Sequence, residues 1–488
     1  MADVAVVGAG LGGLSAAIAL AIDGHNVRLF EAHAQPGGKA GTMTVDGCTF
    51  DTGPSVMTLP HVAEELFSAA GHRMSDAVTL IQPAPAFRYR FHDGTSLDVH
   101  HDLIRTAESI EHALGSDARS DFDEFMKRSA SIWETAAPNF VYGPAPTLWS
   151  VTKLGPKHWS AMVRIDGFRS MHAALTAGIR SEHLRTLLAR YATYNGSDPR
   201  KAPATLNCIA HVEMGLGGFG IRGGLHALVT ALHGLAEQLG VRFHFNSKVT
   251  QVITEGRRAV GVTVNGERVP VNSVVVNADF AQVRNTLLSD STHRLPKPGL
   301  PSMSGYNLAV RTRSDPKRAG HNVLFAEHYL NEFDDIFVNG TEPATPTVYA
   351  CDPTIAHQIE GWSDGTVPLF LMANAPATDS GTVDAERLRR AVLDGACAAG
   401  WIDRRDPVVW ERTPELLAER FPGSHGSLYG AASHGLTAAF QRPSNRVSSI
   451  DGLYLASGSA HPGGGVPLAI LSGRAAAEAL RSATESKR

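Results

Sequence analysis

The first thirty-one residues constrain the fold more than any other part of the chain. Residues 4–7 are apolar and typical of a short buried strand, and a glycine-rich turn, residues 8–13, follows them. Residues 14–22 are rich in alanine, leucine and isoleucine and predict a helix, while residues 27–30 predict a second strand that ends in Glu31. A strand, a tight turn, a helix and a returning strand make a βαβ unit, so the pattern predicts an α/β fold with a parallel sheet.

The turn carries the G-x-G-x-x-G pattern as Gly8, Gly10 and Gly13. Gly8 permits the tight turn, Gly10 lets a pyrophosphate approach the backbone, and Gly13 lets the helix pack closely on the strand. The free N–H groups at the helix N-terminus then face the phosphates. Glu31 can accept hydrogen bonds from two ribose hydroxyls and disfavours a 2′-phosphate, which argues against NADP. A purely structural turn is the alternative, but the surrounding strand, helix and acid favour a dinucleotide site.

Composition and charge exclude several other classes of protein. The chain has 488 residues, 43% hydrophobic and 19% charged, which is typical of a globular protein with more than one structural unit. A net charge of −4 gives no reason to expect nucleic acid. The four cysteines lie far apart without a C-x-x-C pair, so we expect no metal site and no disulfide framework, but reduced thiols in a cytoplasmic protein. Residues 5–22 carry no charge, but the glycine turn in their middle favours strand, turn and helix over a membrane span.

A second helix whose N-terminus follows a glycine-rich loop is predicted at the other end of the chain. Gly463, Gly464 and Gly465 precede Pro467, which suits the first turn of a helix predicted over residues 468–480. Two helix N-termini of this kind suit a ligand with two chemically different parts, each of which interacts with one of the helix ends. The first would bind a pyrophosphate, and the second would face a flavin ring, where the helix dipole stabilises the negative charge gathered after reduction. This arrangement favours FAD over NAD.

The order of the predicted elements indicates a discontinuous nucleotide-binding domain. The apolar segment 274–276 returns the chain to the nucleotide fold, so much of what precedes it is an insertion. We expect a Rossmann-like domain and an inserted α+β part that binds substrate and faces a membrane. The first would comprise residues 1–90, 215–290 and 420–488, and the second residues 91–214 and 291–419.

Residues 125–175 are rich in aromatic side chains and prolines. Three of the six tryptophans lie here, with Lys153, Lys157 and Arg164 interleaved. A core wrapped by loops is one interpretation. An interfacial patch is the other, because Trp beside Lys or Arg suits a membrane surface. The aromatic residues are Phe125, Trp133, Phe140, Tyr142, Trp149, Trp159 and Phe168.

Further motifs extend along nearly the whole chain. Besides the N-terminal glycine turn with Glu31, they include Gly37-Gly38-Lys39 and residues 50–54 (FDTGP). Gly223-Gly224 precede another predicted helix, and residues 454–467 (YLASGSAHPGGGVP) close the set. Together these motifs resemble those of the bacterial carotenoid desaturases of the phytoene-desaturase type, and the last stretch is the most specific to that group. Residues 190–194, 321–325, 332–334 and 372–376 are similar to the subgroup that desaturates the 3,4 bond of 1-hydroxy or 1-methoxy carotenoids.

This resemblance implies a set of FAD contacts. Val249 would touch the adenine through its backbone, and Ser459, which follows Gly458 where many flavoproteins have an acid, suggests a backbone or hydroxyl contact to the ribityl chain. His461, in the loop that would face the flavin, is the candidate acid or base, although it can equally serve only to pack that loop. The predicted cofactor residues are Gly8, Gly10, Gly12, Gly13, Glu31, Gly38, Lys39, Ser55, Val56, Val249, Asn277, Gly458, Gly465, Val466 and Pro467.

The activity implied by the resemblance is FAD-dependent desaturation of an acyclic carotenoid. A hydride would leave an allylic carbon for the flavin N5, and the adjacent proton would pass to a weak base or water. Such an enzyme would associate peripherally with the inner face of the membrane and return its electrons to a quinone or oxygen. Phytoene desaturase, another flavin oxidase of the amine oxidase fold, and a non-catalytic flavin-binding scaffold are the alternatives. Candidate polar groups for the substrate end are Tyr191, Tyr194, Asn195, His321 and Asn322.

Overall fold

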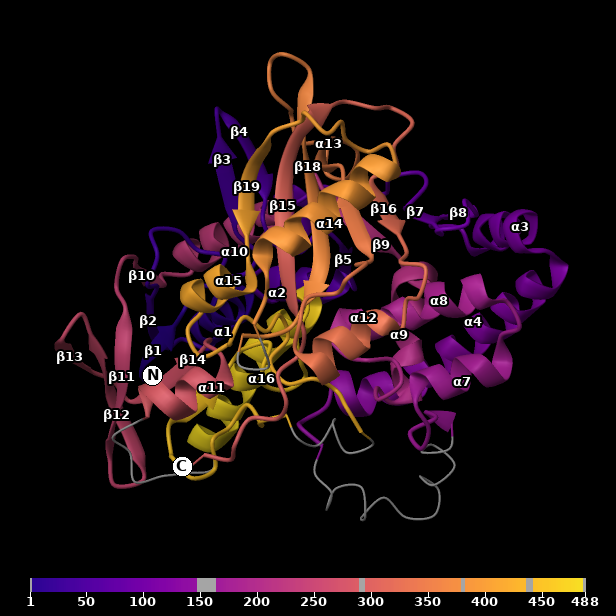
Figure 1. Ribbon diagram of the computed structural model, residues 1–488. Coiled ribbons are helices and arrows are strands. Elements are labelled where there is room, and N and C mark those ends of the chain that lie inside the picture. Colours follow the sequence, from indigo (N-terminus) through magenta and orange to yellow (C-terminus); the bar gives the residue numbers. More distant parts are fainter. Residues whose placement is uncertain (1, 147–163, 289–294, 379–381, 436–441, 486–488) are drawn as a thin grey trace.

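A five-stranded parallel sheet forms the centre of the part of the structure that holds the predicted βαβ unit (Figure 1). The computed structural model of the protein describes residues 2–146, 164–288, 295–378, 382–435 and 442–485. The strand order is β10-β2-β1-β14-β20, so the sheet collects strands from both ends and from the middle of the chain. The strands are β1 (Asp3–Val7), β2 (Asn26–Phe30), β10 (Arg242–His244), β14 (Ser273–Val276) and β20 (Leu453–Leu455).

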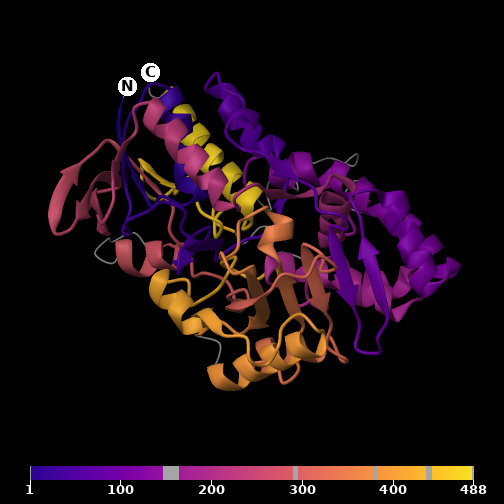
Figure 2. The ribbon, with the colours of Figure 1, turned by 90° about the horizontal axis from the view of Figure 1, so that it is seen from above.

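The helices α1 (Leu11–Ile22), α10 (His226–Gln238) and α16 (Val466–Glu485) belong to this part, and Figure 2 shows them side by side. The predicted βαβ unit is confirmed, with α1 beginning three residues earlier than expected. Glycines permit the close crossing of α1 and α16, since a Cβ at Gly473 would lie 2.2 Å from the Gly12 carbonyl oxygen. The helix expected over residues 468–480 is likewise longer, because its first turn already includes Val466 and Pro467.

Between β10 and β14 the chain forms a three-stranded antiparallel sheet. Its order is β11-β12-β13, and it lies on the opposite side of the molecule from the helices between residues 103 and 189 (Figures 1 and 2). Val252 and Val262 are paired and buried in the core that it shares with the parallel sheet. The strands are β11 (Val249–Glu255), β12 (Arg258–Val264) and β13 (Glu267–Pro270).

A seven-stranded sheet makes up most of the second part. Its order is β19-β15-β18-β17-β16-β7-β8, and α14 (Ala385–Ala398) packs on one side of its central strands. Alternation over residues 87–91 and the turn residues 92–95 predict a hairpin, which the structure confirms as β7 and β8, and β7 also pairs in parallel with β16. The strands are β7 (Phe87–Arg90), β8 (Ser96–Val99), β15 (Ser304–Arg313), β16 (His321–Leu324), β17 (Val348–Cys351), β18 (Thr366–Ala375) and β19 (Val408–Arg412).

Helices α3 (Leu103–Leu114), α4 (Ser116–Ala136), α7 (Met171–Gly178) and α8 (Glu182–Ala189) pack against the other side of this sheet. The helix expected over residues 184–194 is wrong at its end, because α8 stops at Ala189 and a 3₁₀ turn, Arg190–Asn195, follows. Within this turn the Thr193 hydroxyl donates to the Arg190 carbonyl (2.8 Å). Gly196, at φ +61°, then ends it.

Short elements connect these layers. The helix predicted over residues 59–70 is α2 (His61–Ala69), and β3 (Thr42–Val45) pairs with β4 (Cys48–Asp51). Among the described residues no helix is both long and apolar enough to cross a membrane. The remaining elements are β5 (Met57–Thr58), η1 (Met74–Asp76), β6 (Leu80–Ile81), η2 (Ala137–Val141), η4 (Ala204–Asn207), α9 (Cys208–Ala210), η5 (His211–Gly215), β9 (Gly218–Ile221), α11 (Phe280–Gln282), η6 (Val283–Leu287), α12 (Asn331–Asp334), η7 (Asp335–Asn339), α13 (Pro353–Ala356) and α15 (Pro414–Arg420).

We propose that the chain divides into the two parts whose residue boundaries the sequence suggested. The parallel sheet draws on segments of all three stretches of the first part. Strand β7 lies just before the proposed boundary at residue 90 but pairs in the seven-stranded sheet, so it is the strand on which the chain crosses from one part to the other.

Candidate functional site

One cavity of about 870 Å³ runs through both parts of the protein. At one end it is lined by the glycine turn, Glu31, the segment 37–40 and the loop before α16. All the predicted cofactor residues except Gly13 line it, and so does His461. Tertiary folding therefore brings together residues separated by more than 400 positions. That each of them contacts FAD stays a prediction.

The glycines of the N-terminal turn are required by close packing as well as by access to a ligand. Gly8 has φ +94°, and a Cβ there would lie 2.7 Å from the Asn277 carbonyl oxygen. A Cβ on Gly12 would meet the Ala456 carbonyl oxygen at 2.0 Å, and one on Gly13 would meet that of Gly8 at 1.9 Å. Gly12 thus gives α1 its close approach to the end of β20, and Gly13, which does not line the cavity, closes the turn on itself.

Asn277 fixes this turn from the end of β14. With its amide oriented so that both ends are satisfied, its nitrogen donates to the Ala456 carbonyl (2.7 Å), and its oxygen accepts from the N–H groups of Gly10 (3.1 Å) and Gly13 (3.3 Å). The side chain thereby ties three strand ends of the parallel sheet together. Sequence reasoning gave Asn277 a contact with the cofactor but not this role in holding the turn.

Glu31 is buried, with 6% of its surface exposed, and its carboxylate serves the same turn. The N–H of Ala9 donates to its Oε2 (2.7 Å) and the N–H of His33 to its Oε1 (2.9 Å). Each carboxylate oxygen can accept a further hydrogen bond. Because Glu31 also lines the cavity, it can hold the turn and accept from ribose hydroxyls at the same time.

Three cations line the cavity without a carboxylate within 4 Å among the described residues: Arg412 is buried, and Lys39 and Arg442 are partly buried. Lys39 donates from Nζ to the carbonyls of Ser427 (2.8 Å) and Leu428 (3.0 Å), and burial lowers its pKa. Burial also lowers the pKa of Arg412 and of Arg442 to about 10. Asp279, which also lines the cavity, interacts with Lys39 and Arg442 at longer range and is one carboxylate for three cations. Because poorly compensated charge away from water is costly, this wall fits an anionic ligand. Isolated arginines far from any motif give no signal in the sequence, and Arg412 and Arg442 were missed.

The ends of α1 and α16 also fit a bound dinucleotide. Gly10 precedes α1 without a side-chain cap, and neither helix has an acidic residue in its first turn. A Cβ on Gly465, at φ +113°, would find no atom within 4 Å, so the backbone before α16 is open on that side. Open N–H groups at two helix ends, together with these three cations, match the anionic and electron-accepting parts of FAD.

His461 lines the cavity, but one of its ring nitrogens is engaged. Nε2 lies 2.9 Å from the Gly143 carbonyl oxygen, and burial lowers the pKa of the ring, which favours the neutral form. An imidazole that donates to a carbonyl carries its proton on Nε2, so Nδ1 is its basic nitrogen. A catalytic role of His461 stays a prediction.

The other half of the cavity is mainly apolar and belongs to the inserted part. Of the five candidate polar groups for the substrate end, Tyr194 and Asn195 line the cavity, whereas Tyr191, His321 and Asn322 are buried outside it. The apolar wall includes Trp133, Phe140, Val141, Ile165, Leu206 and Ile209, so part of the aromatic stretch 125–175 faces the cavity. Trp149, Trp159, Lys153 and Lys157 lie outside the described residues.

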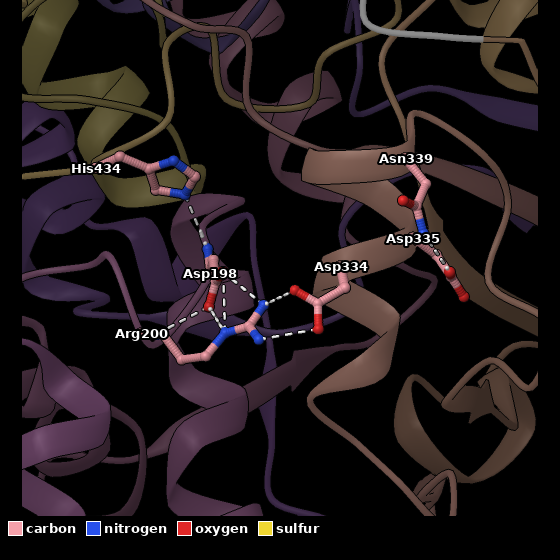
Figure 3. Close-up of polar contacts among 6 residues, drawn as sticks. All are labelled: Asp198, Arg200, Asp334, Asp335, Asn339 and His434. Carbon is pink, nitrogen blue, oxygen red and sulfur yellow. Dashed lines mark hydrogen bonds and ion pairs between the residues drawn. The ribbon is translucent and has the colours of Figure 1, made fainter.

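A charged cluster beside the cavity holds its elements in place (Figure 3). Arg200 donates to both carboxylate oxygens of the buried Asp198 and to both of Asp334 on α12. The backbone N–H of Asp198 donates to Nε2 of His434 (3.0 Å), whose pKa is lowered to about 4 by burial. The neighbouring Ser433 accepts from Asn195 (2.7 Å), and both of these side chains line the cavity. The cluster therefore fixes the wall that carries Asn195.

Comparison with known proteins agrees with this geometry. The family model described as flavin containing amine oxidoreductase matches residues 11–481. A solved putrescine oxidase variant matches 99% of each chain with a TM-score of 0.63 at 17% identity. Cyclohexylamine oxidase from Brevibacterium oxydans matches all of both chains with a TM-score of 0.61, also at 17% identity. The chain is an FAD-dependent oxidoreductase and belongs to the flavin-containing amine oxidoreductase family, with the Rossmann-type fold predicted above.

Within this family the chain belongs with the bacterial carotenoid desaturases. Hydroxyneurosporene desaturase of Rubrivivax gelatinosus is 36% identical over 99% of this chain and 94% of that relative. Carotenoid 3,4-desaturase of Haloarcula japonica is 32% identical over 98% of both chains. The 4,4′-diapolycopene oxygenase of a Methylomonas species is 32% identical over 96% of both. The resemblance noted in the motifs is thus confirmed along nearly the full length.

Proposed function

We propose that the protein desaturates acyclic carotenoids, forming the 3,4 double bond of a 1-hydroxy or 1-methoxy carotenoid. The observation that carries this proposal is the single cavity, which joins a dinucleotide-binding end to a long apolar end. Relatives named for hydroxyneurosporene and carotenoid 3,4-desaturation, similar over nearly the whole chain, support the substrate class.

The residues divide the work between cofactor and substrate. The glycine turn, Glu31 and the loop before α16 bind and orient FAD, which when bound supplies the hydride acceptor. The apolar wall holds the polyene and excludes water, so the carbons to be desaturated are presented in a fixed place. Nδ1 of His461 is the candidate acceptor for the proton that leaves the adjacent carbon. The electrons then pass on to a quinone or to oxygen.

We propose that the enzyme takes its insoluble substrate from the inner face of the membrane. Phe140, Val141 and Ile165 line the apolar end of the cavity, and all three belong to the aromatic stretch 125–175. In the same stretch, Tyr142 is 45% exposed and Phe168 is 66% exposed. Exposed aromatic residues beside a cavity wall suit reversible docking at a lipid interface.

The test is a side-by-side reaction in lipid with FAD-loaded enzyme. Phytoene and a 1-hydroxylated acyclic carotenoid are offered separately, and the products are followed by absorption and mass. We expect longer-wavelength absorption and a loss of two hydrogens only with the hydroxylated substrate. Efficient conversion of phytoene without preference would refute the 3,4-specific assignment and leave carotenoid desaturation standing. Gain of an oxygen atom would instead indicate an oxygenase.

A further inference from the structure

A buried guanidinium lies in the cavity wall inside a cage of aromatic rings. Arg190, at the start of the 3₁₀ turn after α8, is only 9% exposed and lines the cavity. Its guanidinium carbon lies 5.2 Å from the centre of the Tyr194 ring and 5.7–5.8 Å from those of Phe87, Tyr89 and Tyr349. Cation–π contacts of this kind stabilise the charge and fix the plane of the group.

The hydrogen bonds of Arg190 use only one of its three nitrogens. Nη1 lies 3.2 Å from the Tyr194 hydroxyl and 3.4 Å from that of Tyr89, and both are bonds to described residues. No carboxylate of the described residues lies within 4 Å of it. The compensating charge is Glu213, which Arg190 reaches through tyrosine hydroxyls: Tyr194, which lies 3.2 Å from Nη1, donates to that carboxylate (2.5 Å). A guanidinium has five N–H donors, so Nε and Nη2 can still donate to a ligand.

We propose that Arg190 recognises the oxygen at C1 of the substrate and so fixes which bond is desaturated. This inference rests on the proposed function. A hydroxyl and a methoxy oxygen both accept hydrogen bonds, and a guanidinium only donates, so one residue can serve either end group. A polyene that lacks the oxygen would leave the buried N–H donors without an acceptor. A tunnel that selects its substrate by shape alone would also allow a linear polyene to bind in several registers, with different bonds at the flavin.

The position of Arg190 matches the chemistry of the substrate. The C1 oxygen is three bonds from C3 and four from C4, so the group that binds it must lie beside the reacting carbons. Arg190 contacts Tyr349, whose hydroxyl lies 2.5 Å from the Ser55 hydroxyl. Ser55 belongs to the loop predicted to contact FAD. The guanidinium is thus one side chain away from the cofactor end of the cavity.

Neighbouring hydroxyls are less suited to this task. The single proton of Tyr194 is donated to Glu213. The Tyr349 hydroxyl lies between Ser55 and Nδ1 of His321 (2.7 Å), so protein groups occupy it on both sides. The Nε and Nη2 groups of Arg190, in contrast, donate no hydrogen bond to a described residue.

The test compares Arg190→Met with the wild-type enzyme and with Arg185→Met, both loaded with FAD. Arg185 lies on α8 and donates to the carbonyls of Ile179 and Arg180 (both 3.0 Å) outside the cavity, which makes it a matched control. The kcat/KM is measured for a 1-hydroxylated acyclic carotenoid and for its analogue without the hydroxyl. We expect Arg190→Met to lower the preference for the hydroxylated substrate roughly 10- to 100-fold, mainly by raising its KM. This is the effect expected from the loss of one charge-assisted hydrogen bond. Flavin content and spectrum should not change, and Arg190→Lys should restore part of the preference.

Several results would overturn the inference. One is an unchanged preference in Arg190→Met, and another is an equal loss on both substrates. If Arg190→Met does not fold, the inference is tested on the wild-type enzyme instead. A site that only donates hydrogen bonds should give the 1-methoxy substrate a kcat/KM within about tenfold of that for the 1-hydroxy substrate. Rejection of the methoxy substrate as strongly as of the unoxygenated one refutes donor recognition. A wild-type enzyme with no preference for an oxygenated end refutes the proposed function, and this inference with it.

Discussion

Replacing Glu31 by alanine tests the dinucleotide site at its most buried acid. The carboxylate accepts two backbone N–H groups, from Ala9 at 2.7 Å and from His33 at 2.9 Å, and lines the cavity where the ribose is predicted. A hydrogen bond to a charged group contributes about 1.5–3 kcal/mol. Loss of one such bond to the ribose weakens FAD binding by roughly 10- to 100-fold, and loss of two weakens it further.

The free protein is affected separately, and the two effects can be distinguished. Without the carboxylate, the N–H groups of Ala9 and His33 lose their acceptor, at a cost of about 1–3 kcal/mol each when no water replaces it. Glu31→Gln keeps the shape and one acceptor oxygen, so its flavin affinity should fall between those of the wild type and Glu31→Ala. Urea unfolding of the apoprotein measures the first effect, and fluorescence titration with FAD measures the second. Full flavin occupancy and an unchanged Kd in Glu31→Ala would remove this residue from the site.

Three further predictions concern the surrounding structure. Arg200→Met should lower the free energy of unfolding by about 3 kcal/mol, because Asp198 is fully buried and loses its bidentate partner; a change below 1 kcal/mol in urea unfolding would contradict this. Burial raises the pKa of Glu332 from 4.5 to about 7, so the folded state binds the proton more tightly than the unfolded state does. Protonation of Glu332 therefore contributes stability that is complete below pH 4.5 and is lost as the pH rises through about 7. The urea midpoint of the wild type should fall over this pH range, and that of Glu332→Gln should not show this decline. Phe168→Ser should reduce co-sedimentation with liposomes more than Ile104→Ser, a matched control that is 65% exposed on α3, and equal effects would argue against a membrane-docking role for Phe168.

Local sequence was enough to predict the βαβ unit and the dinucleotide site. Gly8 and Glu31 lie within one such unit, and the periodicity of its two strands and its helix is set by near neighbours. The apolar segment 274–276, which forms most of β14, was predictable for the same reason, because a short continuous apolar run is consistent with a strand buried on both faces. The motifs of the last segment located the second helix end without any knowledge of what packs against it.

Tertiary structure decided what the sequence could not. Gly12 is required because its helix meets the Ala456 carbonyl, and Asn277 holds the turn through that same carbonyl; neither contact leaves a local pattern. Helix α8 ends at Ala189, where the chain tightens into a 3₁₀ turn, and helical periodicity gave no sign of this end. Arg190, which is buried, and Arg442, which is partly buried, became part of the site only when the fold placed them beside one cavity. Burial and the lack of a nearby carboxylate are properties of the folded chain, and for a single arginine in a sequence they cannot be read from its neighbours.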